Sequence, residues 1–114
     1  MNVMFAQGDL LIERVDDVEP SGRILSADPT GVTVLAEGEL TGHRHSIFDR
    51  VTMFKDEALA REIPADLYIG HVKIESGSAV VHHQEHAPIT LIEGTYRVRR
   101  QRELEPKDAT IVAD

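Results

Sequence analysis

The sequence predicts an all-β fold, a small single-domain barrel or sandwich with one short helix, over residues 1–114. Short apolar runs rich in Val, Ile and Thr alternate with clusters of Gly, Pro and Asp, a pattern typical of short strands. Only residues 55–63 have a helical pattern. A chain of 114 residues, 41% of them hydrophobic, is long enough for one buried core and too short for two.

The N-terminal half contains three expected strands. The first is "DLLIERV" at 9–15, and turn-rich connectors follow at 16–22 and 26–31. "VTVLAEGEL" at 32–40 is β-branched at its start, which favours a strand. "GHRHSIFDRVTMF" at 42–54 is predicted to form a longer strand.

The expected helix is "KDEALAREI" at 55–63, because Ala and Leu are good helix formers and Pro64 lies just beyond it. It can contain one or two turns. Two strands are predicted after it, "DLYIGHVKIE" at 66–75 and "AVVHH" at 79–83, with "SGS" between them as a break.

The C-terminal part begins with an expected strand, "APITLI" at 87–92. "EG" at 93–94 is predicted to make a tight turn into a further strand, "TYRVRRQRE" at 95–103. The tail "PKDATIVAD" is expected to add a short final strand.

The formal charge of −8 argues against nucleic-acid binding, because contacts to the phosphate backbone need a basic face. The local exception is "YRVRRQR" at 96–102. There we expect Tyr96 and Val98 to point inward, and Arg97 and Arg99 to form a solvated strand face that discourages edge pairing.

The cell compartment is predicted from what the sequence lacks. There is no Cys, which excludes disulfides, thiolate catalysis and cysteine zinc knuckles. The first residues lack the basic and apolar regions of a signal peptide, and no apolar run approaches the roughly 18 residues of a membrane span. We therefore expect a cytoplasmic protein without membrane partners. A small sheet with open edges also favours a homo-oligomer.

Two histidines stand one residue apart in "TGHRH". Side chains alternate between the two faces of a strand, so His43 and His45 share a face with Ile47, Val51 and Met53. That face is the more apolar one. Two imidazoles are therefore predicted to lie a few ångströms apart on the inner face, where they need polar partners.

A second histidine cluster, "HHQEH", follows an apolar run at residues 82–86. Strand parity points His83 inward and His82 outward. His86 has the opposite parity and can join His83 only if the chain turns or bulges, and Pro88 argues against a regular central strand here. His71 has no ligand-like neighbour in the sequence.

A divalent metal would supply the partners that these histidines need, and imidazole suits Zn, Fe or Ni. The predicted ligands are His43, His45, His83 and His86, with His82 as an alternative to His83. A carboxylate could complete the shell. The candidates are Glu37, Glu39, Asp49 and Glu85.

The sequence resembles a family of small, largely uncharacterised bacterial and phage proteins. The matching segments are "QGDLLIERV" (7–15), "AEGELTGHRH" (36–45), "HQEHAPI" (83–89) and "GTYRVRRQRE" (94–103). The resemblance implies a β-rich protein with a metal site at His43, His45, His83 and His86. It implies no stated activity.

Two weaker resemblances concern shorter stretches. "HRH" with a later histidine cluster is similar to the metal-site layout of the cupins, although the glutamate expected after the pair and the "PxG" motif are missing. "LLIERVDDVEPSGRIL" at 10–25 is similar to the first strand and mobile loop of co-chaperonins.

These observations give two hypotheses of different classes. In the first, the protein binds one divalent metal through its histidine cluster, with an unidentified small-molecule ligand or substrate and Glu85 as a nearby acid or base. In the second, it is a non-enzymatic structural or interaction module, related to phage or chaperonin machinery, and its histidines have no functional metal.

Overall fold

The computed structural model describes residues 3–38 and 42–101, together with the backbone of 110–113. The strands and the one short helix are β1 (Val3–Gln7), β2 (Leu10–Arg14), β3 (Arg23–Leu25), β4 (Thr33–Glu37), β5 (Arg44–Ile47), β6 (Thr52–Lys55), η1 (Glu57–Leu59), β7 (Tyr68–His82), β8 (Ile89–Arg100) and β9 (Thr110–Ala113). The expected all-β class is confirmed.

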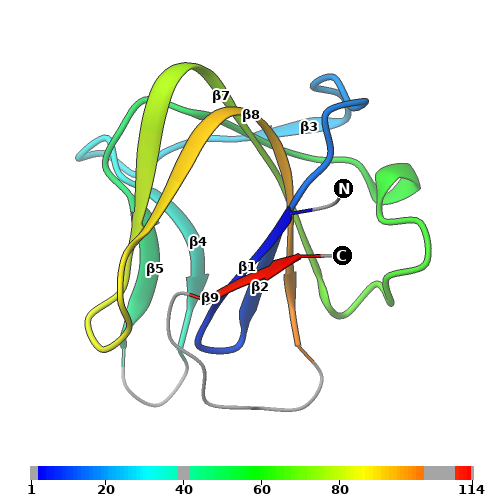
Figure 1. Ribbon diagram of the computed structural model, residues 1–114. Helices are drawn as coiled ribbons and strands as arrows, with labels where there is room; N and C mark the ends of the chain where they lie inside the picture. The colour runs from blue at the N-terminus through cyan, green and yellow to red at the C-terminus, as the bar shows by residue number, and fades with distance from the viewer. Residues whose placement is uncertain (1–2, 39–41, 102–109, 114) are drawn as a thin grey trace.

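All nine strands belong to one antiparallel sheet. Its main path runs β3-β6-β7-β8-β2-β1-β9, and β4 joins through β5, which pairs with β7 (Figure 1). The described pairings do not join β3 to β9, so the sheet is open. The sheet folds over on itself like a sandwich. The open edges exclude the closed barrel, which was the other predicted architecture.

The described part of the chain has no helix long and apolar enough to cross a membrane.

Strands β7 and β8 form a long ribbon that arches through both halves of the fold (Figure 1). The sequence predicted two strands in place of each, separated by "SGS" and by a turn at "EG", and this was wrong. Both glycine-containing segments bend the ribbon instead. Ile74 pairs with Gly94 and Ser78 with Ile92, so three residues of β7 stand opposite one residue of β8. Such a bulge bends a strand without ending it.

The bend also explains why the predicted long strand at 42–54 is broken. β5 pairs with the end of β7, where Ile47 lies opposite Val81, and β6 pairs with the first half, where Met53 lies opposite Val72. The chain must therefore leave the sheet between Ile47 and Thr52 to pass the bend.

The expected helix is present but shorter than predicted. One 3₁₀ turn, Glu57–Leu59, replaces the helical stretch 55–63. Asp56 caps it, because its carboxylate accepts a hydrogen bond from the Ala58 N–H at 3.1 Å. Arg61 has a positive φ of 55°, which ends the helical path.

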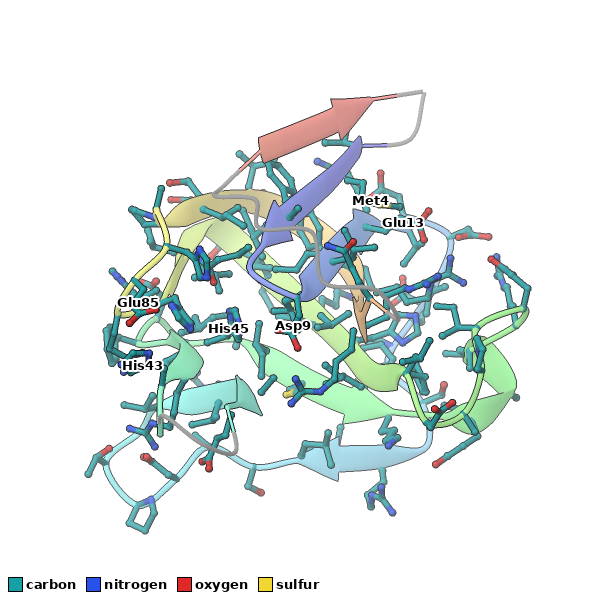
Figure 2. All side chains as sticks on the ribbon, turned by 90° about the horizontal axis from the view of Figure 1, so that it is seen from below. Met4, Asp9, Glu13, His43, His45 and Glu85 are labelled. Atoms are coloured by element: carbon teal, nitrogen blue, oxygen red, sulfur yellow. The ribbon has the colours of Figure 1, made fainter. Side chains whose placement is uncertain are left out.

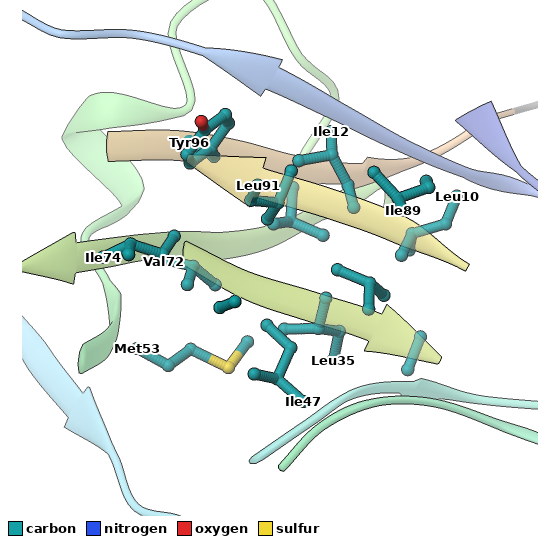
Figure 3. Packing of buried hydrophobic residues seen from close by; sticks show 14 residues of the cluster. Leu10, Ile12, Leu35, Ile47, Met53, Val72, Ile74, Ile89, Leu91 and Tyr96 are labelled. Atoms are coloured by element: carbon teal, nitrogen blue, oxygen red, sulfur yellow. The ribbon is translucent and has the colours of Figure 1, made fainter. Parts of the chain in front are cut away.

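The core lies between the folded halves of the sheet and is mainly aliphatic (Figure 3). Ile47 and Met53 belong to it, in agreement with the inward parity assigned to the histidine-bearing strand. Tyr96 and Val98 are buried as expected. The full set is Leu10, Ile12, Leu35, Ala36, Ile47, Met53, Val72, Ile74, Ala79, Val81, Ile89, Leu91, Tyr96 and Val98.

A second, smaller buried cluster lies at the other end of the ribbon, where Ala60 and Ile63 pack with Tyr68. Arg97 was expected to point into solvent, but it is only 8% exposed and pairs with Glu13 and Glu62. The segment after η1 covers this face of β8. The alternation of side chains along a single strand does not reveal contacts with such a distant segment.

Candidate functional site

The candidate site begins at a two-residue hairpin loop between β1 and β2. Gln7 pairs with Leu10, which leaves Gly8 and Asp9 as the loop. Gly8 has a φ of +60°, and a Cβ at this position would lie 2.9 Å from the His86 Nε2 atom. Glycine therefore allows both the turn and the close approach of His86.

All four predicted ligand histidines meet beside this hairpin. The His83 ring is the centre of the group, with its centroid 4.5 Å from that of His45, 4.7 Å from that of His86 and 5.6 Å from that of His43. His43 and His45 come from β5 and the residue before it. His83 and His86 come from the loop after β7, so the chain leaves the strand before His86, as predicted.

A carboxylate that the sequence did not single out also lies in the cluster. Figure 2 shows Asp9 beside His45, with His43 and Glu85 farther to the left. The Asp9 Oδ1 atom lies 3.7 Å from the His45 Nε2 atom. Its other oxygen accepts a hydrogen bond from Arg100 at 2.8 Å, which fixes the carboxylate.

Gln7 fixes the tautomer of His45. The Gln7 amide nitrogen donates to two backbone carbonyls, Val81 at 3.1 Å and Ala87 at 2.9 Å. Its oxygen therefore faces the His45 Nδ1 atom, at 2.8 Å. An amide oxygen only accepts, so Nδ1 carries the proton and Nε2 presents its lone pair to the cluster.

Burial favours the neutral form of two histidines of the cluster, His45 and His83. His45 is 4% exposed, and burial lowers its pKa from 6.5 to about 4. The charge of His83 lowers this pKa further, while Asp9 opposes the shift. Burial, followed by the charges of His86 and His43, also lowers the pKa of His83. Neutral imidazole is the form that ligates a metal.

His83 has a hydrogen bond that opposes ligation in the described conformation. Its Nδ1 atom accepts from the Glu85 backbone N–H at 3.0 Å, so in the neutral ring Nε2 carries the proton. Among the described residues, no group of three or more histidine, aspartate or glutamate side chains is arranged to hold a metal ion. The four histidine rings lie close together, but the described side chains are not arranged as a preformed metal-coordination site.

The other predicted carboxylates lie in different surroundings. The Glu85 Oε1 atom is 3.6 Å from the His43 Nδ1 atom, at the rim of the cluster. Asp49 was a candidate to complete the metal shell, but it is exposed and accepts from the Val80 N–H at 2.8 Å. Glu37 is exposed at the end of β4, and Glu39 lies outside the described residues.

The two remaining histidines lie outside the cluster. His82 is exposed, as parity predicted, and its ring packs against Phe48. His71 is buried near the other end of β7. Its Nδ1 atom lies 2.8 Å from the Tyr68 hydroxyl, a partner that the sequence did not indicate.

Gln7 and Asp9 are the residues that the sequence reasoning missed. The available signal was the dipeptide "GD" between two apolar runs, "VMFAQ" and "LLIER", which is a strong short-range hairpin pattern. Treating Asp9 as the start of a strand hid the hairpin and the residues on either side of it.

We expect Gln7→Leu to lower the free energy of unfolding by roughly 2 kcal/mol, because the variant leaves two carbonyls and the His45 N–H without their buried partner. Urea unfolding of both proteins measures this difference. Gln84→Leu is the matched control, since Gln84 is exposed and accepts one bond from the Arg44 N–H. Equal losses in the two variants would contradict a special role for Gln7.

Comparisons with known proteins place the chain in a family. Residues 6–101 match the family model described as a domain of unknown function, DUF8820. Neither the comparison with curated proteins nor the one with solved structures gave a match. The matched segment contains the hairpin and both histidine clusters and covers most of the chain. The protein therefore belongs to the DUF8820 family.

Proposed function

We propose that the protein binds one divalent transition metal, Zn, Fe or Ni, through His43, His45, His83 and His86. The Asp9 carboxylate would be an additional ligand. The proposal concerns metal binding and not a particular reaction. The His43–His45 pair at the start of β5, with a later histidine cluster, gives a cupin-like order of ligands on an open sheet.

The observation that carries the proposal is the Gln7–His45 hydrogen bond. Metal-binding histidines usually donate their second ring N–H to an oxygen, which fixes the tautomer and orients the ring. Here the Gln7 oxygen accepts from His45 Nδ1 at 2.8 Å, and Nε2 is directed toward Asp9. Gln7 is itself fixed by two backbone carbonyls and is fully buried.

The gathering of the rings supports the same function. Four imidazoles with centroids separated by 4.5–5.6 Å along the chain of contacts would repel one another if protonated. Metal coordination would keep the rings neutral, because the cation would take the nitrogen lone pairs that protons otherwise occupy. Ligation by His83 requires its ring to give up the bond from the Glu85 N–H, so small ring rotations must accompany binding.

The second candidate is a structural or interaction module without a functional metal. It is favoured by the His83 hydrogen bond and by the lack of a preformed cage among the described side chains. In that case His45 serves, with Gln7, to connect β5 to β1.

Calorimetric titration of untagged, metal-free protein with Zn²⁺, Ni²⁺ and Fe²⁺ separates the two candidates. We expect one metal per chain, and elemental analysis of protein as purified should agree. Binding should weaken as the pH falls, because protons compete for the imidazoles. Heat signals no larger than buffer blanks for all three metals would leave the structural module as the function.

A further inference from the structure

We propose that a pocket on the outer face of β5 and β7 binds a small planar aromatic carboxylate. The pocket has a volume of about 230 Å³. Pockets for drug-sized ligands start at roughly 300 Å³, so this one fits a single ring. Its lining residues are Arg44, Ser46, Phe48, His82, His83 and Gln84.

The pocket offers an aromatic surface formed by two rings, Phe48 and His82, whose planes are inclined by 37°. Ser46 and His82 are cross-strand partners, and Phe48 follows two residues later with its ring centroid 4.8 Å from that of His82. Phe48 is 61% exposed, so its ring is accessible to a ligand from solvent. An aromatic ring bound beside Phe48 and His82 would cover this surface and stack in the offset geometry that such rings prefer.

A cation lines the same pocket. Within the part of the chain that the structure describes, the Arg44 guanidinium forms no ion pair, although the protein carries a net charge of −8. A guanidinium can donate two parallel hydrogen bonds to a carboxylate. The Arg44 backbone is held beside the pocket, because its N–H donates to the Gln84 Oε1 atom at 2.9 Å.

The pocket and the histidine cluster meet at His83, which belongs to both. A carboxylate ligand would therefore lie next to the proposed metal site. Binding in the pocket itself requires no metal, so this inference can fail while the metal proposal stands, and the reverse also holds.

The test is an NMR titration of the ¹⁵N-labelled, metal-free protein with benzoate. For so small a ligand we expect a Kd of about 1 mM and saturable shifts at the amides of Phe48, His82 and Gln84. Benzamide tests the need for charge, and cyclohexanecarboxylate tests the need for an aromatic ring. Each should bind roughly tenfold more weakly than benzoate.

Two variants locate the binding groups. Arg44→Gln and Phe48→Ala should each weaken benzoate binding roughly tenfold. Arg50→Gln and Ile92→Ala are matched controls at exposed positions outside the pocket, and they should bind as the wild type does. The NMR spectrum of each variant also reports whether it is folded. Shifts that do not saturate, equal binding of benzamide, or wild-type affinity in Arg44→Gln would overturn the proposal.

Discussion

His45→Ala is expected to lower metal affinity by orders of magnitude. The substitution removes the proposed ligand atom, His45 Nε2, whose lone pair is free because Nδ1 donates to the Gln7 Oε1 atom at 2.8 Å. Loss of an orienting partner alone costs a metal site roughly 10- to 100-fold, so loss of a ligand should exceed that. Calorimetric titration with Zn²⁺ measures the change.

A graded series of variants gives this prediction its controls. Gln7→Leu keeps the His45 ring but removes its orienting bond, so its affinity should fall between those of His45→Ala and the wild type. His82→Ala and His71→Ala should bind as the wild type does, because neither ring lies in the cluster. Equal affinity in the wild type and His45→Ala would refute the proposed ligand set.

The metal-free protein is expected to lose stability steeply as the pH falls from about 6.5 to 4. Burial lowers the pKa of His71 to about 4, with Arg97 and Arg61 as further causes, and burial likewise lowers the pKa of His45 to about 4. In both cases the folded-state pKa lies below the unfolded value of 6.5. The unfolded chain therefore takes up protons first, and stability that is fully present above pH 6.5 is lost on acidification.

Each of these histidines accounts for roughly 3 kcal/mol of that loss. Urea unfolding at several pH values, with a chelator present, measures the total. His71→Phe should remove the contribution of His71, roughly 3 kcal/mol, from the pH dependence, because Phe cannot titrate and can still pack on the Phe54 ring. His82→Ala, at an exposed position, should leave it unchanged. A His71→Phe variant as acid-sensitive as the wild type would show that burial of His71 is not the cause.

The sequence predicted the all-β class, but it missed β1 and β3 and misplaced the bends. Period-two patterns identified the faces of Ile47, Met53, Tyr96 and Val98, because each of these packs against a single core. Gly94 was predicted to be a turn, since Gly ends many strands. It instead pairs with Ile74 in the middle of β8. Whether a glycine ends a strand or bends it depends on the partner strand, which local patterns do not contain.

The candidate site was predicted in part, for a similar reason. The alternation of side chains assigns the residues of one strand to its two faces. It therefore placed His43 and His45 on the same face and directed His82 outward. It could not find Asp9 and Gln7, because these reach His45 from β1 and its hairpin loop, a segment far away in the chain. The exposure of Arg97 was also misjudged, since its cover comes from the distant segment around Ala60 and Glu62.

The site combines side chains from three segments that only the folded sheet brings together: the β1–β2 hairpin, β5 and the loop after β7. In the unfolded chain these three segments lie apart, so a ligand of the complete cluster binds the native state more tightly than the unfolded chain. Mass action then adds its binding energy to folding, about 2.7 kcal/mol at a free concentration one hundred times the Kd. The concentration of free ligand would thereby determine how often the protein unfolds. It would also determine how long the protein survives in the presence of proteases.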